Sequence, residues 1–128
     1  MSDTLTHGVR IIVRPQYVAD QSDPDASHWL FAYHITIRNE GERTVQLLSR
    51  HWVITNGEGH VEEVRGPGVV GYQPVLQPGE QFQYTSGCPL GTPVGTMHGE
   101  FNMVVSESNE PFDAMINPFT LAAPRALN

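Results

Sequence analysis

The chain contains no lysine and only one cysteine, and each scarcity excludes a class of protein. Cys88 has no partner for an internal disulfide, and a metal site built from several cysteines is also excluded. All seven basic residues are arginines, and 14 acidic residues outnumber them, which gives a net charge of −7 at pH 7. Nucleic acids and anionic lipids bind basic surfaces, so we expect neither as a partner.

Long hydrophobic runs are absent as well. The sequence has no stretch of about 18 apolar residues, the length that a membrane span requires. The first nine residues contain Asp3, Thr4 and Thr6 and lack the basic and then apolar pattern of a secretion signal. We therefore expect no membrane insertion and a cytoplasmic location. A length of 128 residues is typical of one domain.

Helical periodicity is also scarce, and apolar and polar residues alternate instead. Phe31, Tyr33, Ile35 and Ile37 are separated by polar or small residues, as in a strand with one buried face. The 12 glycines and 10 prolines favour turns between such segments. Further strands are predicted over residues 9–17, 45–55, 60–65, 81–86, 97–107 and 115–121, with a short extended piece around residues 74–79 and a loop over residues 87–95.

Seven or eight short strands with regular turn signals predict an all-β fold, a single-domain antiparallel β-sandwich. Trp52 is the expected centre of its core, beside Phe31 and Phe101. Alternation places Arg50 on the same strand face as Trp52. We expect Arg50 to stack on the indole or to pair with a carboxylate such as Glu63.

The segment 66–71 has the letters of a G-x-G-x-x-G motif, which binds dinucleotides when a helix begins at the motif. Pro74 and Pro78 follow too soon for such a helix, so the dinucleotide interpretation fails. Two interpretations stay open. In the favoured interpretation, the glycines provide turn conformations and close packing. Alternatively, backbone amides form a small anion site, with ligand-binding residues Arg65, Gly66, Gly68 and Gly71.

No catalytic or metal-binding set emerges from the sequence. An acidic loop contains Asp20, Asp23, Asp25 and His28, but it lacks the glycine and the terminal glutamate of an EF-hand, so a solvated loop is favoured. Cys88 has no neighbouring base that would activate its thiol, and no G-x-S-x-G motif occurs. We therefore predict no enzyme activity, no metal site and no cofactor.

Five motifs occur in order along the chain: VQLLSRHWVIT at 45–55, EVRGPGVVG at 63–71, LQPGE at 76–80, YTSG at 84–87 and TPVGTM at 92–97. With these motifs the sequence resembles the ApaG family over about residues 8–122. The resemblance implies a fibronectin-type-III-like sandwich that forms one domain over residues 1–128. It also implies an association with cobalt resistance and magnesium efflux, and with protein contacts in the eukaryotic proteins that carry similar domains. The family has no established catalytic residues.

The favoured function is therefore that of a non-catalytic module that binds an unidentified protein partner. Its loops hold more apolar residues than solvent-exposed loops need, and tyrosine is common at binding hot spots. The predicted partner-binding residues are Val69, Val70, Tyr72 and Leu90. Edge strands also make a homodimer conceivable. The alternative is a small-ligand binder that takes pyrophosphate, a nucleotide or a divalent metal at the glycine-rich segment.

Overall fold

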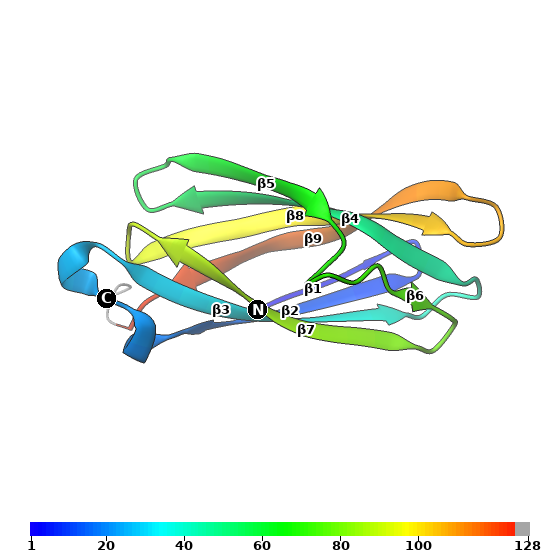
Figure 1. The fold of residues 1–128 in the computed structure, drawn as a ribbon, viewed down its shortest axis with the longest axis horizontal. Helices are drawn as coiled ribbons and strands as arrows, with labels where there is room; N and C mark the ends of the chain where they lie inside the picture. Colours follow the sequence, from blue (N-terminus) through cyan, green and yellow to red (C-terminus); the bar gives the residue numbers. More distant parts are fainter. Residues whose placement is uncertain (125–128) are drawn as a thin grey trace.

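The computed structural model describes residues 1–124 and is a sandwich of two antiparallel sheets (Figure 1). The first sheet has the strand order β1-β2-β3-β7, and the second has the order β5-β4-β8-β9, with β6 paired to β4. The strands are β1 (Ser2–Thr6), β2 (Val9–Tyr17), β3 (Trp29–Asn39), β4 (Val45–Asn56), β5 (Val61–Pro67), β6 (Val75–Leu76), β7 (Gln81–Leu90), β8 (Val94–Val105) and β9 (Glu110–Ala122).

Two short 3₁₀ turns, η1 (Ala19–Gln21) and η2 (Pro24–Ala26), connect β2 to β3. No helix within residues 1–124 is long and apolar enough to cross a membrane. The predicted all-β antiparallel sandwich is confirmed. The strands predicted over residues 45–55 and 60–65 are present as β4 and β5, and they pair as a hairpin with Trp52 opposite Val64.

Strand β1 was not predicted, because Leu5 is the only large apolar residue in the segment Ser2–Thr6 and no alternation is visible. The segment is a strand because its backbone pairs with β2, from Ser2 opposite Val13 to Thr6 opposite Val9. Backbone hydrogen bonding thus determines this strand where side-chain pattern does not.

The predicted loop over residues 87–95 was wrong except at residues 91–93, because β7 extends to Leu90 and β8 begins at Val94. Strand β7 continues to Leu90, with Gly87 opposite Ala32 and Pro89 opposite Leu30 of β3. Proline and glycine usually interrupt a strand, but β7 lies at the edge of its sheet. An edge strand can tolerate a missing amide donor on its unpaired side, so the sequence signal for a loop was misleading here.

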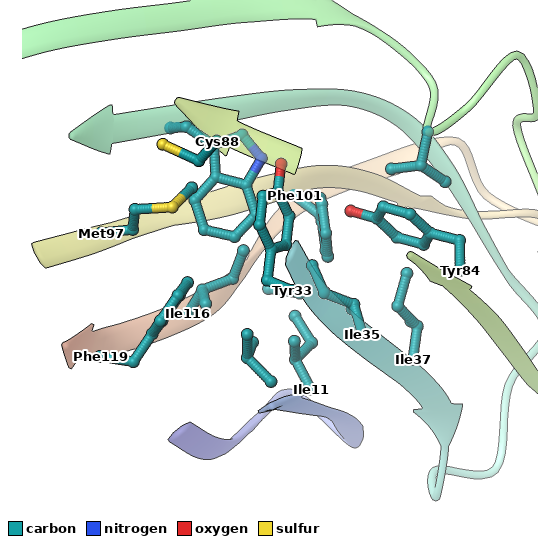
Figure 2. Packing of buried hydrophobic residues seen from close by; sticks show 14 of the residues in the cluster. Ile11, Tyr33, Ile35, Ile37, Tyr84, Cys88, Met97, Phe101, Ile116 and Phe119 are labelled. Carbon is teal, nitrogen blue, oxygen red and sulfur yellow. The ribbon is translucent and has the colours of Figure 1, made fainter. Parts of the chain in front are cut away.

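The core lies between the two sheets and is centred on Trp52, as predicted. The indole makes edge-on contacts with Tyr33, Phe101 and Phe119, at ring-centroid distances of 5.4, 6.2 and 6.0 Å. Such edge-to-face pairs are a favourable arrangement of aromatic rings. Figure 2 shows Tyr33 from one sheet and Phe101 from the other meeting in this cluster, with Ile11 and Ile35 below them.

The two long sides of the sandwich differ. On the side that we call the closed side, β1 lies against β9, and hydroxyls of β1 bond to the backbone of β9. Ser2 Oγ donates to the Asn117 carbonyl (2.8 Å), and Thr4 Oγ1 accepts from the Asn117 amide (3.1 Å). On the other side, the open side, the edge strands are β5 and β7. No hydrogen bond joins these two strands in the part of the chain that the structure describes.

Candidate functional site

A tight turn at Val69–Tyr72 projects from the open side, between β5 and β6. The Val69 amide donates to the Tyr72 carbonyl (2.8 Å), and the Tyr72 amide donates to the Val69 carbonyl (2.9 Å). The two central residues, Val70 and Gly71, both have positive φ (44° and 86°), as in a type I′ turn. A β-branched residue seldom adopts this conformation, so the hydrogen bonds hold Val70 in an unfavourable backbone region.

Two of the four predicted partner-binding residues are exposed and two are buried. Val70 and Tyr72 have exposed fractions of 51% and 62%. Val69 and Leu90 are 1% and 6% exposed, because Val69 packs into the core and Leu90 belongs to β7 opposite Trp29. A partner could therefore contact the side chains of Val70 and Tyr72, whereas those of Val69 and Leu90 stabilise the fold.

The Tyr72 ring is supported from below by the edge strand. It lies 5.8 Å from the ring of Phe82 in β7, and Phe82 lies 6.2 Å from the ring of the buried Tyr84. This aromatic row connects the surface of the turn to the core. Tyr72 is thus exposed on one face and packed on the other.

The glycine-rich segment does not form a row of free amides. Gly66 belongs to β5 and faces Arg50, while the Gly68 amide donates to the Leu48 carbonyl (2.8 Å). Gly71 provides the positive φ that the turn requires. Arg65 points to solvent, 3.8 Å from the Glu63 carboxylate. The Gly68 amide is therefore used within the fold, and Gly71 provides the turn geometry.

Arg50 is held by backbone carbonyls and not by the carboxylate that was expected. Its Nη1 donates to the carbonyls of Pro67 (3.0 Å) and Gly68 (2.9 Å). Gly66 leaves the space for this arrangement, since a Cβ there would lie 2.8 Å from Nη2. No carboxylate lies within ion-pair distance of Arg50 among residues 1–124.

Beside Arg50, a cleft of about 280 Å³ enters the sandwich between the open-side edges. Its lining includes side chains of both sheets, and alternation along β4 and β5 places every second residue towards it. The lining residues are Arg50, Trp52, Ile54, Glu62, Val64 and Met97 from one sheet, and Tyr33, Ser86, Gly87, Cys88 and Pro89 from the other.

Two buried polar atoms have no hydrogen-bond partner within residues 1–124, namely Trp52 Nε1, whose residue lines the cleft, and the Tyr84 hydroxyl. Burial raises the pKa of the Tyr33 and Tyr84 hydroxyls. A hydrogen bond with Ser86 and then the charge of Arg50 oppose this rise at Tyr33, and the charge of Arg50 opposes it at Tyr84. Figure 2 shows these two hydroxyls extending from their rings at neighbouring positions. Trp52 and Tyr33 thus both line the cleft, and the indole N–H of Trp52 is unpartnered within residues 1–124.

A larger hollow of about 620 Å³ lies at one end of the sandwich, beside the β3–β4 and β8–β9 turns. Its buried polar side chain, Asn39, is fully engaged. Asn39 Nδ2 donates to the carbonyls of Arg43 (2.7 Å) and Leu76 (2.9 Å), and Oδ1 accepts from the Gly41 amide (3.0 Å). This hollow therefore lacks the unpartnered groups found at the cleft.

His51 forms a second polar cluster, on the outer face of the β4 sheet. Its Nδ1 lies 2.7 Å from Glu100 Oε1, and its Nε2 lies 2.7 Å from Glu63 Oε1. These hydrogen bonds, first to Glu100 and then to Glu63, raise the pKa of His51, and burial and Arg65 act in the opposite direction. The carboxylate expected to pair with Arg50 thus pairs with His51. The cross-strand neighbours of His51 could not be assigned without the register.

The other candidates have structural explanations. In the acidic loop, the backbones of Asp23 and His28 pair with each other, at 2.8 and 3.0 Å. No group of three or more side chains among residues 1–124 has the arrangement of a metal site. Burial, and then the charge of Glu62, raise the pKa of the Cys88 thiol to about 11, so the reactive thiolate is scarce at neutral pH.

Comparisons with known proteins agree with this architecture. The family model described as the ApaG domain matches residues 19–105. The chain is 54% identical over 128 residues to Protein ApaG of Dechloromonas aromatica (strain RCB), and the match covers all of both chains. It is 51% identical over 126 residues to Protein ApaG of Parvibaculum lavamentivorans, covering 98% of this chain and 96% of that protein.

Among solved structures, the fold is similar to that of an ApaA protein from Bordetella pertussis, with a TM-score of 0.89 and 51% identity. That alignment covers 95% of this chain and 98% of the other. Both the sequence and the fold therefore match over nearly the full length. The chain belongs to the ApaG family.

Proposed function

We propose that this chain is a non-catalytic binding module that docks a protein partner through the turn at Val70–Tyr72. The observation that supports this proposal is the exposure of two neighbouring apolar side chains on a backbone locked by two hydrogen bonds. A preorganised surface loses little conformational entropy when a partner binds. Tyr72 is also supported by Phe82, so its ring is already ordered for contact.

The family's association with cobalt resistance and magnesium efflux fits this proposal through the partner. A module that regulates a transporter needs no metal ligand of its own. Under this proposal, divalent ions act on the partner protein, and the chain contributes a docking surface.

The test separates binding from stability by changing Val70 and Tyr72 together, as Val70→Asn with Tyr72→Ser. Asparagine tolerates the positive φ of position 70 better than valine does, so the turn should be kept. We expect the double variant to lose the proteins that co-purify with the tagged wild-type chain, with the midpoint of thermal unfolding nearly unchanged.

Leu5→Ser is the matched control, because Leu5 is also exposed (61%) but lies on the closed side, in β1. It should retain every partner that the wild type retains. Retention of the partners by the double variant, or their loss in Leu5→Ser as well, would refute docking through the turn.

A further inference from the structure

We propose that the open-side cleft is a binding site for a small organic carboxylate with an apolar body. This site is distinct from the docking turn at Val70–Tyr72, although carbonyls of the glycine-rich segment hold its guanidinium. Arg50 would bind the carboxylate, and the apolar body would lie between the sheets against Trp52 and Val64.

The charge at one end of the cleft is the first argument. Arg50 is fixed by the two carbonyls that accept from its Nη1, so its orientation is set before any ligand arrives. Its Nη2 and Nε groups have no side-chain acceptor in the part of the chain that the structure describes. A guanidinium with free donors on a fixed plane is suited to a carboxylate, which it binds through two parallel hydrogen bonds.

The unpartnered donor on Trp52 is the second argument. Trp52 is 98% buried, lines the cleft, and has an indole Nε1 with no acceptor. Indole N–H can only donate. A buried donor without a partner lowers stability by about 1–3 kcal/mol, so a fold that keeps one usually has a reason. A ligand that enters the cleft deeply enough to bring an acceptor oxygen to Nε1 would supply the missing partner.

The far end of the cleft restricts the ligand. Glu62 lies opposite Ile54 in the β4–β5 ladder, whereas Gly66 lies opposite Arg50. Four residues along a strand correspond to about 13 Å, so a negative charge lies at the other end of the cleft from the guanidinium. Between them the lining is apolar, with Trp52, Val64 and Met97. The site therefore favours a ligand with one carboxylate and disfavours a second negative group at its distal end.

The volume agrees with a small ligand. At about 280 Å³ the cleft is near the lower limit of the range of about 300–1,000 Å³ that is usual for small-molecule sites. A phenyl ring with a short acid side chain is an appropriate probe. Inorganic phosphate has the charge but lacks the apolar body, so it tests the second part of the proposal.

The experiment is a titration of the ¹⁵N-labelled full chain with phenylacetate, followed through the indole N–H signals. The chain has two tryptophans, so Trp29 serves as an internal reference for Trp52. We expect the Trp52 signal alone to shift downfield and to saturate. Phenylacetamide, which is neutral, should bind about 10-fold or more weakly, because it lacks the charge-assisted hydrogen bonds. Phosphate should leave the signal unchanged.

Substitutions test which residues bind the carboxylate. Arg50→Gln should weaken phenylacetate binding about 10-fold or more. Arg14→Gln, which removes an exposed arginine on β2, should leave binding unchanged. Glu62→Gln, which removes the negative charge from the far end of the cleft, should permit binding of a dicarboxylate such as phenylenediacetate.

Three outcomes would overturn the proposal: a Trp52 signal that does not saturate, equal binding of acid and amide, or equal weakening by Arg14→Gln. Should Arg50→Gln not fold, the comparison of acid with amide on the wild-type chain decides the question alone. Phosphate binding as tight as that of phenylacetate would also refute the requirement for an apolar body.

Discussion

Each long side of this sandwich is formed by one edge strand from each sheet, but the two sides differ in how their polar groups are hydrogen-bonded. On the closed side, hydroxyls of β1 bond to the backbone of β9, through Ser2, Thr4 and Thr6. On the open side, within the described residues, Trp52 Nε1 and the Tyr84 hydroxyl are buried without partners, and Arg50 pairs with no carboxylate. The hydroxyls of the closed side therefore stabilise the fold through their hydrogen bonds. The polar groups of the open side are available to a ligand or a partner.

The largest difference between the two sides should be in the free energy of unfolding that is lost when a side chain is shortened to alanine. Ile116→Ala, in β9 at 2% exposure, should lower the free energy of unfolding by about 2–5 kcal/mol, because a cavity forms in a packed region. Val64→Ala, in β5 beside the cleft, should lower it by about 1 kcal/mol, since its side chain is only partly buried. Urea unfolding of both variants measures this ranking, and equal losses would show that the open side is packed as well as the closed side.

A pair of glycine variants tests the open-side turn. Gly68→Ala should lower the free energy of unfolding by about 2 kcal/mol or more, because its Cβ would lie 2.4 Å from the Tyr72 carbonyl oxygen and φ is +60°. At Gly71 there is space for a Cβ, and only the φ of +86° opposes alanine, so the loss should be about 1 kcal/mol. Thermal unfolding gives both values. A larger effect at Gly71 would contradict the geometry of the turn.

Removal of single hydroxyls compares the polar groups directly. Ser2→Ala deletes the donor to the Asn117 carbonyl and should lower the free energy of unfolding by about 1 kcal/mol. Tyr84→Phe deletes a buried hydroxyl that has no partner, so stability should stay the same or increase by up to about 1 kcal/mol. Opposite signs in denaturant unfolding would support the comparison, and a loss in Tyr84→Phe would show that the hydroxyl has a partner.

The smallest expected effect is the pH dependence of stability that arises from His51, on the outer face of the β4 sheet. Glu100 and Glu63 raise the pKa of His51 above its ordinary value of 6.5, so the folded state favours the charged imidazole. Its contribution to stability is therefore complete below about pH 6.5 and is lost as pH rises through the raised pKa. NMR titration of His51 should show this, and Glu100→Gln should lower its pKa. Unchanged titration in that variant would contradict the assignment.

Most of the fold prediction came from the alternation of apolar and polar residues, because a half-buried strand presents every second side chain to the core. It predicted Val9–Tyr17 as a strand with its exact bounds and placed Trp52 at the core centre. It failed at Ser2–Thr6, where polar composition hides a paired strand, and at Pro89, where an edge position tolerates proline.

The candidate sites were predicted only in part. Exposure of Val70 and Tyr72 agrees with their loop position, but neighbouring Val69 is in the core. The sequence signal was the same for all three, since a loop pattern does not reveal which way each side chain points. The partner of Arg50 was also misassigned, because two backbone carbonyls, which every residue possesses, accept from it.

By itself, the sequence determined which segments are extended and which of their faces are apolar, since these follow from local alternation and turn residues. Only the tertiary structure decided which edges meet. Pairing register brings β1 to β9 and leaves β5 and β7 without hydrogen bonds to each other within the described residues. Register depends on contacts between residues far apart in sequence, such as Arg50 with Gly68 or His51 with Glu100, and no local pattern encodes them.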